Sequence, residues 1–347
     1  MSVVRVAVDA TNLARDRRGM GRIARAVLRV AARDERTEIV LLARRRDDLA
    51  LRAEFPALAV QRPKTARRAG RYDVVWYPFN GMRFEASAPT LVTIHDAFAF
   101  TEPHPERIAR YREQAPIRRA ARRATRLVTD SNWSRDEIAR ELHVAPARID
   151  VALPEPDAFW SAGSGGELPP ALVAQRFALI VGAGEARKNI RLAIDACARA
   201  LHGPHEMLVV VGALPPPLRA YARERKLRCG EIAASDVMLR TLYRRARVVL
   251  VPSLGEGFGL IAVEALACGA PLLAARAGAL PEAVGDAAPL LDPNDPELWA
   301  RAVRRIFDDD AHEADLRAAA VARFMSRDRD AGAARTLRLL HDLARGA

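Results

Sequence analysis

Short apolar runs of strand length alternate with helical stretches along nearly the whole chain. In the first half, the runs expected as strands are residues 3–9, 38–43, 73–77, 89–94, 126–129 and 149–153. In the second half they are residues 177–181, 207–211, 247–252 and 271–275, with helices expected at 190–201, 236–246 and 297–308. Strands that alternate with helices form parallel sheets covered on both faces. The pattern therefore predicts an α/β protein of the doubly wound, Rossmann-like class.

The length of the chain predicts more than one domain. At 347 residues it exceeds what a single hydrophobic core usually organises, so two domains are expected. Residues 154–170 are rich in proline, glycine and serine and form the clearest linker. We expect a first domain over residues 1–160, a second over 161–325 and a helical tail over 326–347. In such folds ligands bind in a cleft at the carboxyl ends of the strands.

Residues 253–269 place two carboxylates, Glu256 and Glu264, around a glycine-rich turn between an expected strand and an expected helix over 260–268. Glycines such as Gly257 lack a Cβ, so backbone N–H groups can approach a ligand closely. The positive end of the following helix is directed at the same place. The stretch therefore predicts a phosphate site, flanked by acids that accept hydrogen bonds from sugar or ribose hydroxyls.

This string resembles the signature of the family 4 retaining glycosyltransferases, in which two glutamates with seven residues between them hold a nucleotide-sugar donor. The resemblance implies that Glu256 contacts hydroxyls of the transferred sugar and that Glu264 binds the ribose. It implies the GT-B fold, with the acceptor on the first domain, the nucleotide sugar on the second, and the tail packed back on the first. The residues that it places beside the sugar and diphosphate are Gly257, Phe258, Gly259 and Leu260.

A second loop, residues 182–189, follows the expected strand 177–181 and contains Arg187 and Lys188. The compact ammonium of a lysine suits a diphosphate, and an arginine can bridge two oxygens. By resemblance, Lys188 and Arg187 bind the diphosphate of the sugar donor. The family often carries an arginine where Ala183 stands, so the sequence leaves open whether one or two cations hold the diphosphate.

The same resemblance implies a functional role for two features of the first half of the chain. Gly19 and Gly21 lie in a loop expected before a helix over residues 23–32, a second loop-to-helix seat for an anion. In the resembled family this loop faces the donor phosphates and the acceptor. His95 follows the expected strand 89–94, and we expect it to donate a hydrogen bond that shapes the sugar pocket.

The net charge of +12 is concentrated in the first half of the chain. Residues 1–165 carry 30 basic and 21 acidic side chains, and eight arginines fall within residues 107–126, in a helical pattern apart from Pro116. Three interpretations stay open. The stretch is a solvated helix face, a contact with an anionic membrane or lipid-phosphate acceptor, or a nucleic-acid contact. Aromatic residues make up only 5% of the chain, which disfavours nucleic acid.

Other side chains restrict the cellular setting. The cysteines Cys197, Cys229 and Cys268 are odd in number and far apart, so we expect neither disulfides nor a metal knuckle, and a reducing cytoplasm. No apolar stretch reaches about 18 residues and no signal peptide is evident. We therefore expect a cytoplasmic protein, peripheral at most at the inner membrane face. The acidic residues near 309 and 328 lie outside the strand-end loops, so no metal is expected.

The expected function is a metal-independent retaining glycosyltransferase of cell-envelope polysaccharide synthesis, without a tightly bound cofactor. It would move a hexose, mannose first, from a GDP- or UDP-sugar to a glycan or lipid-linked acceptor. The diphosphate would be stabilised by cations and helix amides. The alternative is a nucleotide-sugar or nucleic-acid binding protein without turnover. The residues expected to be catalytic are Glu256, His95 and Lys188.

Overall fold

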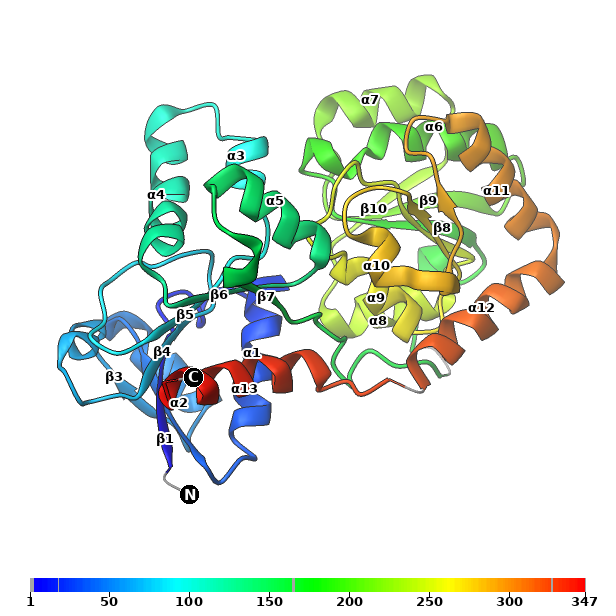
Figure 1. Ribbon diagram of the computed structural model, residues 1–347. Helices are drawn as coiled ribbons and strands as arrows, with labels where there is room; N and C mark the ends of the chain where they lie inside the picture. Colours follow the sequence, from blue (N-terminus) through cyan, green and yellow to red (C-terminus); the bar gives the residue numbers. More distant parts are fainter. Residues whose placement is uncertain (1–2, 18, 164–165, 326, 347) are drawn as a thin grey trace. The chain divides into compact units, whose positions relative to one another are not determined.

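The structure is a computed structural model that describes residues 3–17, 19–163, 166–325 and 327–346. Figure 1 traces the chain through its two compact units. The first unit comprises Met1–Glu155 together with Arg329–Ala347, and the second comprises Pro156–Asp328. The chain therefore leaves the first unit once and returns to it with its last residues.

The first unit is built on a seven-stranded sheet in the order β3-β2-β1-β4-β5-β6-β7. Every neighbouring pair is parallel, as the alternation of strands and helices predicts. The strands are β1 (Val4–Asp9), β2 (Thr37–Leu42), β3 (Ala59–Gln61), β4 (Val74–Tyr77), β5 (Thr90–Thr93), β6 (Arg126–Thr129) and β7 (Ile149–Val151). The α-helices are α1 (Gly19–Ala31), α2 (Asp48–Glu54), α3 (Phe98–Thr101), α4 (Arg107–Arg123), α5 (Asn132–Leu142) and α13 (Ala331–Ala344).

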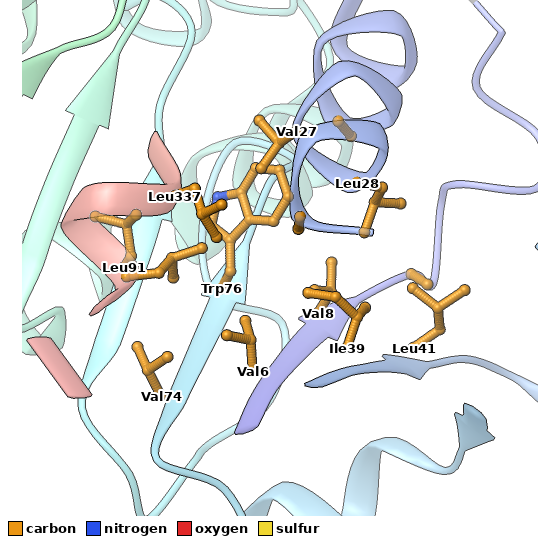
Figure 2. Close-up of a cluster of buried hydrophobic side chains, with 14 of the residues drawn as sticks. Val6, Val8, Val27, Leu28, Ile39, Leu41, Val74, Trp76, Leu91 and Leu337 are labelled. Carbon is orange, nitrogen blue, oxygen red and sulfur yellow. The ribbon is translucent and has the colours of Figure 1, made fainter. Parts of the chain in front are cut away.

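Alternate residues of the central strands fill a core on each face of this sheet. Figure 2 shows Val6, Val8 and Trp76 of the strands beneath Val27 of α1 and Leu337 of α13. The intervening strand residues pack on the other face against α4 and α5. Both faces of a parallel sheet must be covered because its strands are apolar on both sides. One face of the sheet is covered by α1 from the start of the chain and by α13 from its end.

The C-terminal helix α13 belongs to the first unit. Its Leu340 is buried within the same core as Leu337, and Arg335 Nη2 lies 3.0 Å from Asp150 Oδ1. A Cβ on Gly332 would lie 2.0 Å from the carbonyl oxygen of Leu153, so only glycine permits this close approach. The helix begins at Ala331, later than the expected tail, and Ser326 lies outside the described residues.

The second unit repeats the design with a six-stranded parallel sheet in the order β10-β9-β8-β11-β12-β13. Its strands are β8 (Arg176–Val181), β9 (Glu206–Val211), β10 (Cys229–Ile232), β11 (Val248–Val251), β12 (Leu272–Ala275) and β13 (Leu290–Leu291). Its α-helices are α6 (Ile190–Ala200), α7 (Pro216–Glu224), α8 (Asp236–Arg245), α9 (Leu260–Ala267), α10 (Leu280–Val284), α11 (Pro296–Asp308) and α12 (Asp310–Met325).

Two local expectations need correction. Helix α4 continues through Pro116 without a break, and the Pro116 carbonyl oxygen accepts a hydrogen bond from Met82 N at 3.0 Å. Helix α1 begins at Gly19, four residues earlier than expected. Gly19 and Gly21 therefore lie in the first helical turn and not in a loop before it.

Candidate functional site

The strand order of the second sheet brings two loops together. Strands β8 and β11 are neighbours at the centre of the sheet. From β8 the chain continues to β9 on one side, and from β11 it continues to β12 on the other side. In doubly wound sheets this switch point is where ligands bind. The loop after β8 carries Arg187 and Lys188, and the loop after β11 carries Glu256.

The loop after β8 turns sharply before α6. Gly182 has φ +80°, a conformation that favours glycine. A Cβ there would meet nothing within 4 Å, so the space beside the Gly182 backbone is unfilled. Ala186–Lys188 forms one turn of 3₁₀ helix, which ends at Asn189 in the left-handed conformation. The Leu254 N–H donates to the carbonyl oxygen of Arg187 at 2.8 Å. That bond ties the two loops together backbone to backbone.

Glu256 is the centre of a compact ionic cluster. Its Oε1 accepts a hydrogen bond from Lys188 Nζ at 2.7 Å, and its Oε2 accepts one from Arg187 Nη1 at 2.9 Å. Ser253 Oγ donates to Oε1 at 2.7 Å. Arg187 also reaches Glu185, whose Oε2 lies 2.5 Å from Nη2. The carboxylate is thus held by two cations and a hydroxyl.

This cluster is largely shielded from water. Glu256 is 7% exposed, and the side chains of Lys188 and Arg187 are 12% and 15% exposed. Burial by itself raises the pKa of Glu256, but the Lys188 ammonium and the Arg187 guanidinium outweigh it and hold the pKa below its usual value. Glu256 is therefore a carboxylate whose charge is neutralised by the cations expected to bind a diphosphate.

The backbone around Glu256 is confined by a neighbouring turn. Gly278 has φ +57°, and a Cβ on it would lie 2.6 Å from the backbone nitrogen of Glu256. The Ala279 N–H donates to the carbonyl oxygen of Glu256 at 3.0 Å. The turn after β12 therefore holds the backbone of Glu256 in place.

Past Glu256 the chain enters α9. Gly259 has φ +101°, and a Cβ there would meet Leu280 at 2.8 Å, so both its conformation and the space around it require glycine. The Ala262 N–H donates to the carbonyl oxygen of Gly259 at 2.9 Å. Among the described residues the N–H groups of Leu260 and Ile261 have no acceptor, which leaves these two available to an anion. Phe258 and Glu264 are 5% and 3% exposed, so each is buried.

In the first unit, Gly21 is required by packing. A Cβ on it would lie 1.9 Å from the carbonyl oxygen of Asp16. Arg25 closes the same turn: its Nη1 donates to that oxygen at 2.6 Å and to the carbonyl oxygen of Gly21 at 3.0 Å. The conformation of this segment is thus accounted for by its own contacts, and the predicted role of Gly19 and Gly21 toward phosphates stays a prediction.

His95 lies at the carboxyl end of β5 and is 5% exposed. Its Nδ1 is 2.6 Å from Asp130 Oδ2, and its Nε2 is 2.9 Å from the carbonyl oxygen of Pro78. Burial by itself lowers the pKa of His95, but the Asp130 carboxylate and the Pro78 carbonyl outweigh it and raise the pKa to about 9. Both acceptors are satisfied only by an imidazolium that donates from each nitrogen.

The stability of the first unit should therefore fall at alkaline pH. Because the folded pKa of His95 is about 9 and the ordinary value is 6.5, its stabilisation is complete below pH 6.5 and is lost as the pH rises through 9. The loss should be on the order of 3 kcal/mol. Urea unfolding below pH 6.5 and above pH 9 measures it. His95→Gln should lose this pH dependence and His104→Gln should keep it; equal pH dependence in wild type and His95→Gln would contradict the assignment.

The parts of the chain that the structure describes offer neither a cluster of metal ligands nor a membrane-spanning helix. There, no group of three or more His, Cys, Asp or Glu side chains is arranged to hold a metal ion. No helix in the same parts is both long and apolar enough to cross a bilayer. The expectation of metal-independent chemistry stays a prediction.

Two family models match the chain in succession. The model described as Glycosyltransferase Family 4 matches residues 17–154, and the model described as Glycosyl transferases group 1 matches residues 171–323. This chain is a family 4 glycosyltransferase. The first match falls within the first unit and the second within the second unit, so both halves carry the family pattern.

Among known proteins, the glycosyltransferase is 31% identical over 244 residues to O-antigen chain mannosyltransferase B of Escherichia coli. That match covers 64% of this chain and 62% of the relative, which is less than two thirds of the relative's length. A shorter stretch of 85 residues is 47% identical to D-inositol 3-phosphate glycosyltransferase of Corynebacterium diphtheriae, covering 24% of this chain and 20% of that protein.

Among solved structures, Anabaena Alr3699/HepE in complex with UDP and glucose superposes with a TM-score of 0.74 at 18% identity. The superposition covers 98% of this chain and 100% of that chain. At this identity the likeness concerns the fold, which is that of the GT-B glycosyltransferases. The fold class predicted from the sequence is confirmed.

The structure brings part of the predicted glycosyltransferase site together. Arg187, Lys188 and Glu256 are in direct contact, and the residues from Gly257 to Leu260 continue from Glu256 into α9, which carries Glu264. Gly19, Gly21 and His95 belong to the first unit. The roles of all these residues toward a ligand stay predictions.

Sequence reasoning missed three residues that position this site. They are Ser253, which donates to Glu256, Gly278, which admits the Glu256 backbone, and Asn80, whose Oδ1 accepts a hydrogen bond from His95 N at 2.7 Å. Ser253 directly follows the run expected as a strand, residues 247–252, and that placement is a signal that could have identified it. Gly278 carries no such signal, because its role depends on a loop that precedes it by about twenty residues in the chain.

Proposed function

We propose that this chain is a retaining hexosyltransferase that transfers a sugar, mannose first, from a nucleoside diphosphate sugar without a metal ion. The observation that carries the proposal is the contact of Lys188 and Arg187 with Glu256 at the switch point of the second sheet. Two cations and the N-terminus of α9 at one strand edge suit a diphosphate. An adjacent carboxylate suits the hydroxyls of the sugar.

The same contact suggests what happens when the sugar donor arrives. Glu256 contacts both Lys188 and Arg187, and Glu185 contacts Arg187, so both cations have carboxylate partners within the protein. A diphosphate carries more negative charge than one carboxylate, so both cations would turn toward it. The oxygens of Glu256 would then accept hydrogen bonds from the sugar hydroxyls. Binding of the donor thus exchanges one set of partners for another, and each buried charged group keeps an ionic or hydrogen-bonding partner.

Transfer with retention needs no side-chain nucleophile in this proposal. The bond between the anomeric carbon and the diphosphate oxygen breaks, and the new bond to the acceptor oxygen forms on the same face of the sugar. The departing phosphate oxygen takes the proton of the acceptor hydroxyl. Lys188, Arg187 and the amides at the start of α9 stabilise the negative charge on the leaving group, and this preorganised electrostatic stabilisation lowers the barrier.

The names of the relatives support a proposal for the sugar and the acceptor. The relative from Escherichia coli is called an O-antigen chain mannosyltransferase, and the one from Corynebacterium diphtheriae is called an inositol phosphate glycosyltransferase. We therefore propose GDP-mannose as the first sugar donor to test, with UDP-sugars next. The acceptor is a glycan or lipid-linked saccharide of the cell envelope, reached at an anionic membrane surface. The second unit binds the nucleotide sugar and the first unit selects the acceptor.

A screen of sugar donors by mass spectrometry tests the proposal. Purified protein is incubated with GDP-mannose and with UDP-hexoses, with and without glycan acceptors. We expect one donor to be consumed, slowly by hydrolysis alone and faster with an acceptor, and Glu256→Ala to consume it far more slowly. If no donor is consumed and the wild type behaves like Glu256→Ala, the chain is not a transferase for these sugars.

A further inference from the structure

Figure 1 labels helix α4, Arg107–Arg123, of the first unit. This helix combines high positive charge with exposed apolar side chains. Its only acidic residue is Glu113. Ile108 is 68% exposed and Tyr111 is 72% exposed, although both are large hydrophobic residues. The arginines are Arg107, Arg110, Arg112, Arg118, Arg119, Arg122 and Arg123.

The two kinds of residue occupy one side of the helix. At about 100° per residue, Ile108, Tyr111, Arg119 and Arg122 fall within an arc of roughly 80°. The buried residues of α4, among them Ile117, lie on the opposite side and pack on the sheet. The exposed arc borders an open hollow of about 650 Å³ whose lining is mostly arginine. The helix therefore presents a basic surface with apolar side chains within it.

Most of this charge is not used inside the protein. Arg123 pairs with Glu85, and Arg118 donates to Gln114 Oε1 at 3.1 Å and lies over the ring of Phe100. The side chains of the other five arginines have no hydrogen bond or ion pair among the described residues. Unpaired like charges on one helix repel one another, so this surface gains from an anionic partner.

We propose that the exposed side of α4 binds an anionic lipid bilayer, with its arginines on the phosphates and Ile108 and Tyr111 in the interfacial layer. Each arginine near such a surface adds to the affinity, and an apolar side chain gains only where it leaves water. Tyrosine suits the boundary because its ring is apolar and its hydroxyl polar. A nucleic acid or a soluble polyanion would use the charge but not Ile108. This proposal rests on the proposed function in one respect: a lipid-linked acceptor would explain why the protein binds a membrane.

Sedimentation with lipid vesicles tests this surface and needs no turnover. We expect wild-type protein to bind phosphatidylcholine vesicles that contain phosphatidylglycerol, to release them in high salt, and to ignore pure phosphatidylcholine. The variant Arg119→Gln/Arg122→Gln should bind the anionic vesicles about 10- to 30-fold more weakly. Arg301→Gln/Arg305→Gln is the matched control, because it removes two exposed arginines from α11 of the second unit. It should bind nearly as the wild type does.

A second variant separates a bilayer from other anionic partners. Ile108→Ser/Tyr111→Ser keeps every arginine, and we expect it to lose vesicle affinity while retaining any binding to an oligonucleotide or to polyphosphate. The proposal is wrong if wild type does not sediment with anionic vesicles, if the α4 and α11 variants weaken equally, or if Ile108→Ser/Tyr111→Ser sediments as wild type does. Donor consumption without membranes should be unchanged in the α4 variants. If the wild type consumes no donor, that result contradicts the proposed function but not the binding of α4 to the bilayer.

Discussion

Replacing Lys188 by alanine is expected to lower kcat/KM for the sugar donor by about 100- to 1000-fold, which is about 3 to 4 kcal/mol of transition-state stabilisation. Lys188 contacts Glu256 through Nζ at 2.7 Å and is mostly buried, so its charge lies beside the carboxylate and away from bulk water. In the proposed reaction its ammonium faces the charge that develops on the leaving diphosphate. Steady-state kinetics with the donor found by mass spectrometry measures the effect.

The matched control uses another of the chain's three lysines. Lys64 is exposed in the first unit, and Lys64→Ala should leave kcat/KM as in wild type. Lys188→Arg keeps the charge but replaces a compact ammonium with a planar fork, so we expect partial activity. A Lys188→Ala enzyme with wild-type kcat/KM would remove this residue from the mechanism and leave Arg187 as the remaining cation.

Replacing Glu256 by glutamine is expected to separate nucleotide binding from transfer. The amide keeps the shape of the side chain but no longer neutralises Lys188 and Arg187, which are both within 3 Å of it. A free nucleoside diphosphate then meets no competing carboxylate, and we expect its affinity to rise about tenfold. Transfer should fall about 100-fold or more because the sugar hydroxyls lose their charged acceptor. Calorimetry with GDP and UDP, together with donor turnover, measures both.

Two further variants test whether charge is the cause. Ser253→Ala removes one hydrogen bond to the Glu256 carboxylate but leaves its charge, so it should cost only about 1 kcal/mol of stability and should not tighten nucleotide binding. Glu256→Ala removes the carboxylate that Lys188 contacts and leaves Arg187 its contact with Glu185. It should lower the free energy of unfolding by about 3 kcal/mol, and a bound nucleoside diphosphate should restore part of it. Weaker nucleotide binding by Glu256→Gln would contradict the exchange of ionic partners.

Much of the fold is predictable from local sequence. The β-branched run that forms β11 is buried along its whole length, and the apolar helix α9 follows it after a glycine turn, as expected. Sequence reasoning missed β3, β10 and β13, which lie at the outer parts of their sheets. Strand β10 includes Gly230 and Glu231, and β13 has only two residues, so neither forms an apolar run of strand length. Their strand conformation depends on pairing with a neighbour already in place.

For the candidate site, too, some features are predictable from local sequence and others are not. By itself the sequence determined which groups stand at the ends of strands, including Lys188, Glu256 and His95, because strands, turns and helix starts follow from nearby residues. Only the tertiary structure decided that Lys188 pairs with Glu256, 68 residues away, and that His95 pairs with Asp130, 35 residues away. These contacts depend on which strands become neighbours in a sheet. That order is set by packing of the whole core, and local propensity carries no information about it.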